Sequence, residues 1–94
     1  MKNFAKIYGK WALVTGASSG IGAEFAQKLA ELGLNLILVA RRRERLEQRA
    51  TTLEQTFPIQ VRCLSIDLST ENFMARILSE TSDIEIGLLI NNAG

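Results

Sequence analysis

Apolar residues along the chain alternate between short continuous runs and longer stretches with helical spacing. Continuous runs are typical of strands covered on both faces, and here they lie at 11–14, 34–40, 59–66 and 86–90. The run at 59–66 contains more polar residues than the others, which favours an edge position in a sheet. Four strands are therefore expected.

The stretches between these runs predict three helices. The first follows a glycine-rich segment and ends at Gly33, which can cap it; its apolar stripe would be Ile21, Phe25, Leu29 and Leu32. The second spans about 42–57 and ends before Pro58; its stripe would be Leu46, Ala50, Leu53 and Phe57. The third spans 70–82, with Asp67 or Ser69 as its cap; its inward residues would be Phe73 and Ile77.

The resulting order is β-α-β-α-β-α-β. Strands that alternate with helices of this length indicate a parallel sheet with right-handed crossovers. We therefore expect an α/β fold, the first half of a doubly wound (Rossmann) dinucleotide-binding fold with strand order 3-2-1-4. Residues 1–94 would form a single, partial dinucleotide-binding domain that lacks the catalytic half.

Composition narrows the class of protein. The 94 residues carry a net charge of +1, so nothing draws the chain toward nucleic acid or an anionic membrane. One cysteine and no histidine exclude an internal disulfide and leave almost nothing for a metal site. No apolar run approaches the roughly 20 residues of a membrane-spanning helix. We expect a cytoplasmic protein without metal, nucleic-acid or membrane partners.

The segment TGASSGIG directly follows the first strand. Gly16 can turn the chain out of the strand, Gly20 lets a ligand approach the backbone, and Gly22 lets the helix pack tightly. Unpaired N–H groups at the helix start favour a pyrophosphate, although a tight turn without ligand would also need glycines. The predicted cofactor contacts in this segment are Gly16, Ser18, Ser19, Gly20, Ile21 and Gly22.

With NNAG some seventy residues later, TGASSGIG resembles the short-chain dehydrogenase/reductase family across residues 9–94. YGKWALVTGASSGIG and IEIGLLINNAG are also similar to its 3-oxoacyl-CoA reductase and hydroxysteroid dehydrogenase branch. The resemblance implies binding of a nicotinamide dinucleotide and hydride transfer between that cofactor and a carbonyl or alcohol substrate.

The end of the second strand bears on the choice of cofactor. Ala40 stands where NAD-binding relatives would carry a carboxylate, and Arg41, Arg42 and Arg43 follow. Such a run is often only a solvated surface, yet cations at a helix start oppose the helix dipole, and a 2′-phosphate would compensate. We therefore predict NADP, with NAD as the alternative, held by Arg41 with Arg42, while Arg43 faces solvent. Many NADP-dependent relatives also have a basic residue where this chain has Ser19.

Two further segments follow strands three and four. By resemblance, Asp67 and Leu68 would contact the adenine, although Asp67 could instead cap the next helix. The resemblance also implies that Asn91 ties adjacent strands together and that Ala93 and Gly94 border the cofactor ribose. The alternative for NNAG is a plain turn.

The family's catalytic tyrosine, with a lysine four residues later, does not occur in the chain. The single tyrosine is Tyr8, and residue 12 is alanine. We therefore expect a cofactor-binding half that is inactive alone; a stand-alone, non-catalytic nucleotide-binding module or an interaction fragment is the alternative. The run 86–90 would then be an exposed apolar edge through which the chain self-associates, whereas the full-length enzyme would be a homo-oligomer.

Overall fold

A computed structural model describes residues 11–17, 20–67 and 69–92. Ser18, Ser19, Leu68, Ala93 and Gly94 lie outside the described residues. The elements are β1 (Trp11–Thr15), α2 (Gly20–Glu31), β2 (Asn35–Ala40), α3 (Arg43–Thr56), β3 (Val61–Ser65), α4 (Phe73–Glu80) and β4 (Ile86–Asn91). Their order and type are those the apolar pattern predicts.

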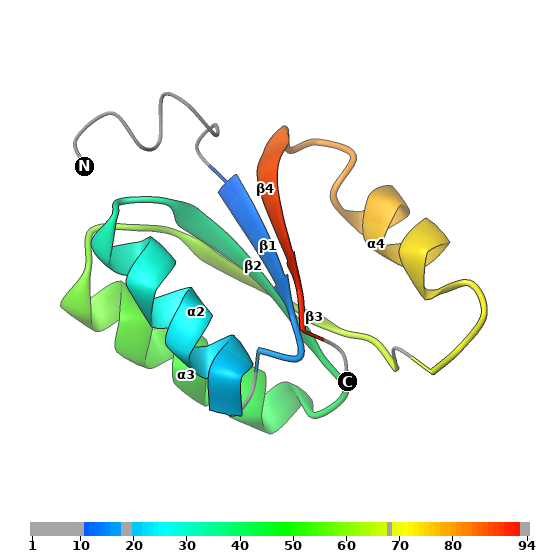
Figure 1. The fold of residues 1–94 in the computed structure, drawn as a ribbon, viewed down its shortest axis with the longest axis horizontal. Helices are drawn as coiled ribbons and strands as arrows, with labels where there is room; N and C mark the ends of the chain where they lie inside the picture. Colours follow the sequence, from blue (N-terminus) through cyan, green and yellow to red (C-terminus); the bar gives the residue numbers. More distant parts are fainter. Residues whose placement is uncertain (1–10, 18–19, 68, 93–94) are drawn as a thin grey trace.

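The strands form one parallel sheet in the order β3-β2-β1-β4, which confirms the predicted topology. Helices α2 and α3 lie on one face of the sheet and α4 lies on the other (Figure 1). Because all strands run in one direction, their carboxyl ends meet at one edge of the sheet, where ligands bind in doubly wound folds. β3 and β4 are the two edge strands.

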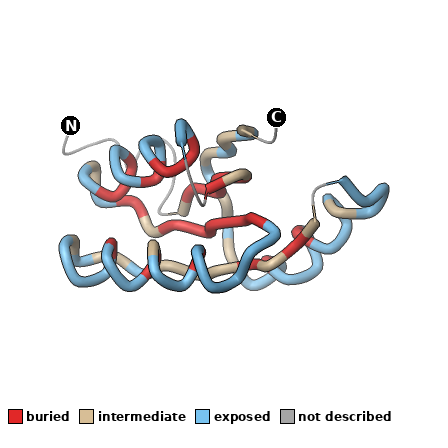
Figure 2. The backbone as a smooth tube through the Cα atoms, turned by 90° about the horizontal axis from the view of Figure 1, so that it is seen from below, coloured by how far each residue is buried: buried red, intermediate tan, exposed pale blue. Residues whose placement is uncertain are grey.

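Alternate residues of the central strands enter two separate cores. Val14 and Leu38 pack with α2 and α3, whereas Leu13 and Ile37 pack with Ile77 of α4. Figure 2 shows that buried residues follow the central strands while the outer sides of the helices are exposed. The central strands β1 and β2 are thus covered on both faces, as their continuous apolar runs predict, whereas alternate residues of the edge strand β4 are exposed.

The buried face of α2 differs from the prediction. Ile21 is 62% exposed and Phe25 is 42% exposed, so the predicted apolar stripe is wrong at both positions. The helix instead buries Leu29 and four small residues, which are Gly22, Ala23, Ala26 and Ala30. Small side chains allow a helix axis to approach its neighbours closely, and here that close approach decides which face turns inward.

The helix ends are partly as predicted. Gly33 has φ +88, and the N–H groups of Gly33 and Leu34 donate to the carbonyls of Ala30 and Leu29, which is a glycine-capped helix end. The apolar stripe predicted for α3 is confirmed, because Leu46, Ala50 and Leu53 are buried.

The predicted cap of α4 is wrong. The N-cap of this helix is Asn72, and neither Asp67 nor Ser69 caps it.

Candidate functional site

Gly16 forms the turn out of β1 that the sequence predicts. Its φ is +63, which is the left-handed region that favours glycine. A Cβ at this position would also lie only 2.7 Å from the carbonyl oxygen of Asn92. Backbone conformation and close packing therefore both require glycine here.

Gly22 is closed in by the same turn. A Cβ on Gly22 would overlap the Gly16 carbonyl oxygen and lie 2.8 Å from the Asn92 side-chain nitrogen. The expectation of tight packing is met, but the partner is the turn after β1 and the chain after β4. Gly16 and Gly22 thus allow the start of α2 to pack closely against the carboxyl ends of β1 and β4.

Gly20 has the opposite environment. It too has a positive φ of +63, and apart from its chain neighbours and the backbone of its own helix, no atom of the described residues lies within 4 Å of a Cβ built on it. Gly20 is the first residue of α2, and both Gly20 and the following Ile21 are exposed. Open space next to unpaired N–H groups at a helix start is what an anionic ligand needs. The predicted cofactor contacts of Gly20 and Ile21 remain predictions.

Thr15 links the central strand β1 to the edge strand β4 at their carboxyl ends. Its side chain is 2% exposed, its hydroxyl donates to the Asn91 Oδ1 at 3.0 Å, and it accepts from the Asn92 N–H at 2.9 Å. The tie that the resemblance implies for Asn91 is therefore present. Sequence reasoning did not assign Thr15 a role, although its position directly before Gly16 was the available signal.

The glycine turn also contacts the end of β2. The Ala17 N–H donates to the Val39 carbonyl at 3.3 Å, and Ala17 is fully buried. Two residues after Val39, the Arg41 carbonyl accepts from the Ser65 hydroxyl at 2.8 Å. The carboxyl ends of β1, β2 and β3 are thereby joined, with the arginine run beside the glycine turn.

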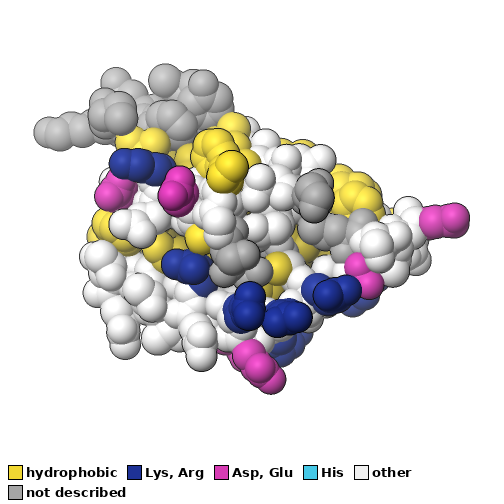
Figure 3. All heavy atoms as spheres, turned by 60° about the horizontal axis from the view of Figure 1, so that its bottom comes forward, with side chains coloured by type: hydrophobic (Ala, Val, Ile, Leu, Met, Phe, Trp, Pro, Cys, Tyr) yellow, Lys and Arg dark blue, Asp and Glu magenta, His cyan; other side chains and the backbone are white. Residues whose placement is uncertain are grey.

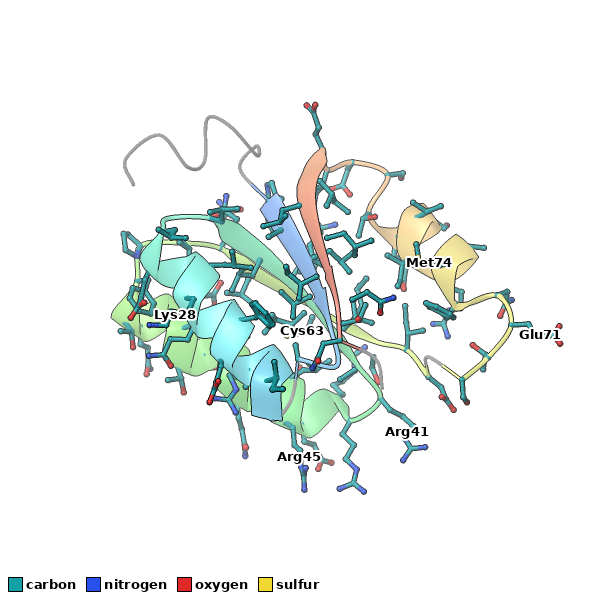
Figure 4. The ribbon with its side chains drawn as sticks, in the orientation of Figure 1. Lys28, Arg41, Arg45, Cys63, Glu71 and Met74 are labelled. Carbon is teal, nitrogen blue, oxygen red and sulfur yellow. The ribbon has the colours of Figure 1, made fainter. Side chains whose placement is uncertain are left out.

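The arginine run is exposed. Arg41, Arg42 and Arg43 all lie at the surface, whereas Ala40 is 5% exposed. Arg42 is the N-cap of α3 and makes no side-chain capping bond. Figure 3 shows basic side chains gathered on this face, and Figure 4 shows Arg41 extending outward from the carboxyl end of β2. Neither Arg41 nor Arg42 forms an ion pair with another residue that the structure describes, and their binding of a 2′-phosphate remains a prediction.

Asp67 follows β3 and forms a local turn. Its Oδ1 accepts from the Ser69 N–H at 2.9 Å and from the Ser69 hydroxyl at 2.7 Å. These two bonds, with a smaller contribution from the Arg41 charge, hold the pKa of Asp67 below its ordinary value. Asp67 is thus anionic at the same edge as Arg41. Its adenine contact remains a prediction.

Among residues 11–17, 20–67 and 69–92, no group of three or more metal-ligating side chains is placed to hold an ion. Within the same residues, no helix has both the length and the apolar character to cross a membrane.

Known proteins resemble this chain over most of its length. The short chain dehydrogenase profile matches residues 10–94. A very-long-chain 3-oxoacyl-CoA reductase-like protein from Arabidopsis thaliana is 46% identical over 90 residues, covering 95% of this chain and 29% of that protein. Human 17-beta-hydroxysteroid dehydrogenase type 3 is 38% identical over 93 residues, covering 99% of this chain and 30% of that protein.

A solved structure of a short-chain dehydrogenase is similar to this chain in both sequence and fold. A short-chain dehydrogenase from Sphingobium yanoikuyae in complex with NADPH is 41% identical, with a TM-score of 0.82 over 89% of this chain and 34% of that one. The chain thus spans less than a third of the length of the two curated relatives. It belongs to the short-chain dehydrogenase family.

Proposed function

We propose that this chain is the cofactor-binding portion of an NADP-dependent oxidoreductase that transfers hydride between the nicotinamide and a carbonyl or alcohol carbon. One observation carries the proposal. The open start of α2 at Gly20 lies at the same edge of the sheet as the exposed Arg41, which directly follows the carboxylate-free end of β2. The first feature suits a pyrophosphate, and the second suits a 2′-phosphate.

The arginines support NADP over NAD. A carboxylate at the position of Ala40 would repel a 2′-phosphate, whereas an alanine does not. A guanidinium can hold a phosphate in a forked, charge-assisted geometry. Such a bond contributes roughly 1.5–3 kcal/mol, or about 10- to 150-fold in affinity. The NADPH complex of the Sphingobium relative supports the same choice.

The names of the curated relatives support a proposal for the substrate class. The names of the two curated proteins refer to 3-oxoacyl-CoA reduction and to 17-beta-hydroxysteroid dehydrogenation. We propose a bulky ketone or secondary alcohol as the substrate of the complete protein. The 94 residues contain no tyrosine with a lysine four positions later, so we propose that they bind cofactor without catalysing hydride transfer alone.

Replacing Arg41 tests the proposal. The Arg41→Gln variant should bind NADP more weakly while its affinity for NAD stays the same, because NAD has no 2′-phosphate. Isothermal titration with each cofactor measures both affinities, and circular dichroism checks the fold. Equal weakening for both cofactors would contradict the assignment of Arg41. A chain that reduces ketones with NADPH would contradict the proposed lack of activity.

A further inference from the structure

Helix α3 presents different residues to its two sides. The Val61 N–H of β3 donates to Glu54 Oε2 at 2.9 Å. Glu47 and Arg43 come seven and eleven residues before Glu54, so the helix period of 3.6 residues puts them on the same side of α3. These positions therefore face the β3 side. At 3.6 residues per turn, Arg45 comes from nearly the opposite side of the helix to Glu47.

The opposite side of α3 looks toward α2. Helix α3 packs on β3 and β2, whereas α2 packs on β2 and β1, and the two helices contact each other. On this side an open hollow of about 390 Å³ is lined by Arg45, Gln48, Arg49 and Thr52. Arg45 belongs to the first turn of α3 and so lies at the end of the hollow nearest the carboxyl edge of the sheet.

Arg41 and Arg45 extend from the same end of the molecule. Figure 4 shows both side chains pointing outward below the carboxyl ends of the strands. Four residues of extended chain span at most about 13 Å, and the helical turn between them shortens that distance. Both side chains are exposed, and neither forms an ion pair with any residue that the structure describes.

We propose that Arg45 is a second specificity-determining residue for the cofactor, which binds the 2′-phosphate from the α2 side while Arg41 binds it from the end of β2. This inference rests on the proposed NADP function. Arg45 would supply a second positive charge for the 2′-phosphate in a chain that has Ser19 where many NADP-dependent relatives have a basic residue. The Ala17–Val39 hydrogen bond keeps the glycine turn against β2, two residues before Arg41.

Arg43 provides a matched control for Arg45. The two arginines are two positions apart in the same first turn, but Arg43 is exposed on the side of the helix that carries Glu54, which is the β3 side. Arg45→Gln should weaken NADP binding about tenfold and leave NAD binding unchanged, whereas Arg43→Gln should change neither affinity by more than about twofold. Arg45→Lys, which keeps the charge, should restore part of the loss. Titration calorimetry on folded variants gives all these values.

The outcomes separate this inference from the proposed function. If Arg45→Gln behaves like Arg43→Gln, or weakens NADP and NAD equally, the role of Arg45 is wrong. If the unsubstituted chain already shows no preference for NADP, the NADP function fails and the role of Arg45 fails with it. A preference that Arg41→Gln abolishes and Arg45→Gln leaves intact overturns the role of Arg45 alone.

Discussion

The hydroxyl of Thr15 should stabilise the site by joining β1 to β4. Thr15→Val keeps the side-chain shape but removes a donor to Asn91 Oδ1 and an acceptor for the Asn92 N–H, at 3.0 and 2.9 Å. Because the Thr15 side chain is 2% exposed, water does not readily replace the lost partner. The Asn92 N–H would lose the Thr15 hydroxyl as its acceptor.

The expected magnitude follows from these contacts. The substitution removes two partly buried hydrogen bonds, each worth about 0.5–1.5 kcal/mol, so we expect Thr15→Val to lower the free energy of unfolding by about 2 kcal/mol. Thr15→Ser keeps the hydroxyl and loses one methyl group, which is worth about 1 kcal/mol. Against a typical domain stability of about 5–15 kcal/mol, both changes are large enough to measure.

Urea unfolding followed by circular dichroism compares the two variants, and amide hydrogen exchange reports on Asn92 directly. The Asn92 amide should lose protection in Thr15→Val and retain it in Thr15→Ser. If the two variants are equally stable and the Asn92 amide is equally protected in both, the hydroxyl does not hold β4 to β1.

Three other substitutions test separate features. Gly22→Ala should destabilise the fold by about 1–3 kcal/mol, because the added Cβ overlaps the Gly16 carbonyl oxygen; a urea midpoint at or above that of the unsubstituted chain would contradict this packing. Asp83 accepts both hydrogen bonds of a forked pair from Arg62 at 3.0 Å, and this pair holds the pKa of Asp83 below its ordinary value of 3.8. The pair therefore contributes stability above about pH 4, which is lost as pH falls through the folded-state pKa. Asp83→Asn should accordingly be less stable than the unsubstituted chain at pH 7 and approach it in acid, and a difference independent of pH would count against the ion pair. Leu89 on the edge strand β4 is 51% exposed, so Leu89→Lys should reduce self-association in sedimentation velocity; a chain that is already monomeric at high concentration would rule out association through β4.

Local patterns were enough to predict the topology. The runs of β1 and β2 are continuously apolar because both faces of these strands are buried, and that signal does not depend on distant residues. Gly16 and Gly33 were predicted for the same reason, since a positive φ makes glycine a local requirement. The start of α4 was missed because a short turn between Asp67 and Ser69 takes up the polar groups that were expected to cap it.

Features that depend on distant contacts could not be predicted in this way. Periodicity pointed to Ile21 and Phe25 on α2, but a close approach to the turn at Gly16 selects the face with small residues. The role of Thr15 depends on partners 76 and 77 residues away. The direction of Arg45 depends on the contact between Glu54 and β3, which no local pattern in the sequence indicates.

The central claim is that the exposed arginines after β2 select a cofactor with a 2′-phosphate. The most direct test is the pair of dissociation constants of NADP and NAD, measured on the unsubstituted chain at one salt concentration. The structure predicts tighter binding of NADP by about 10- to 150-fold. Equal affinity, or tighter binding of NAD, would contradict the claim.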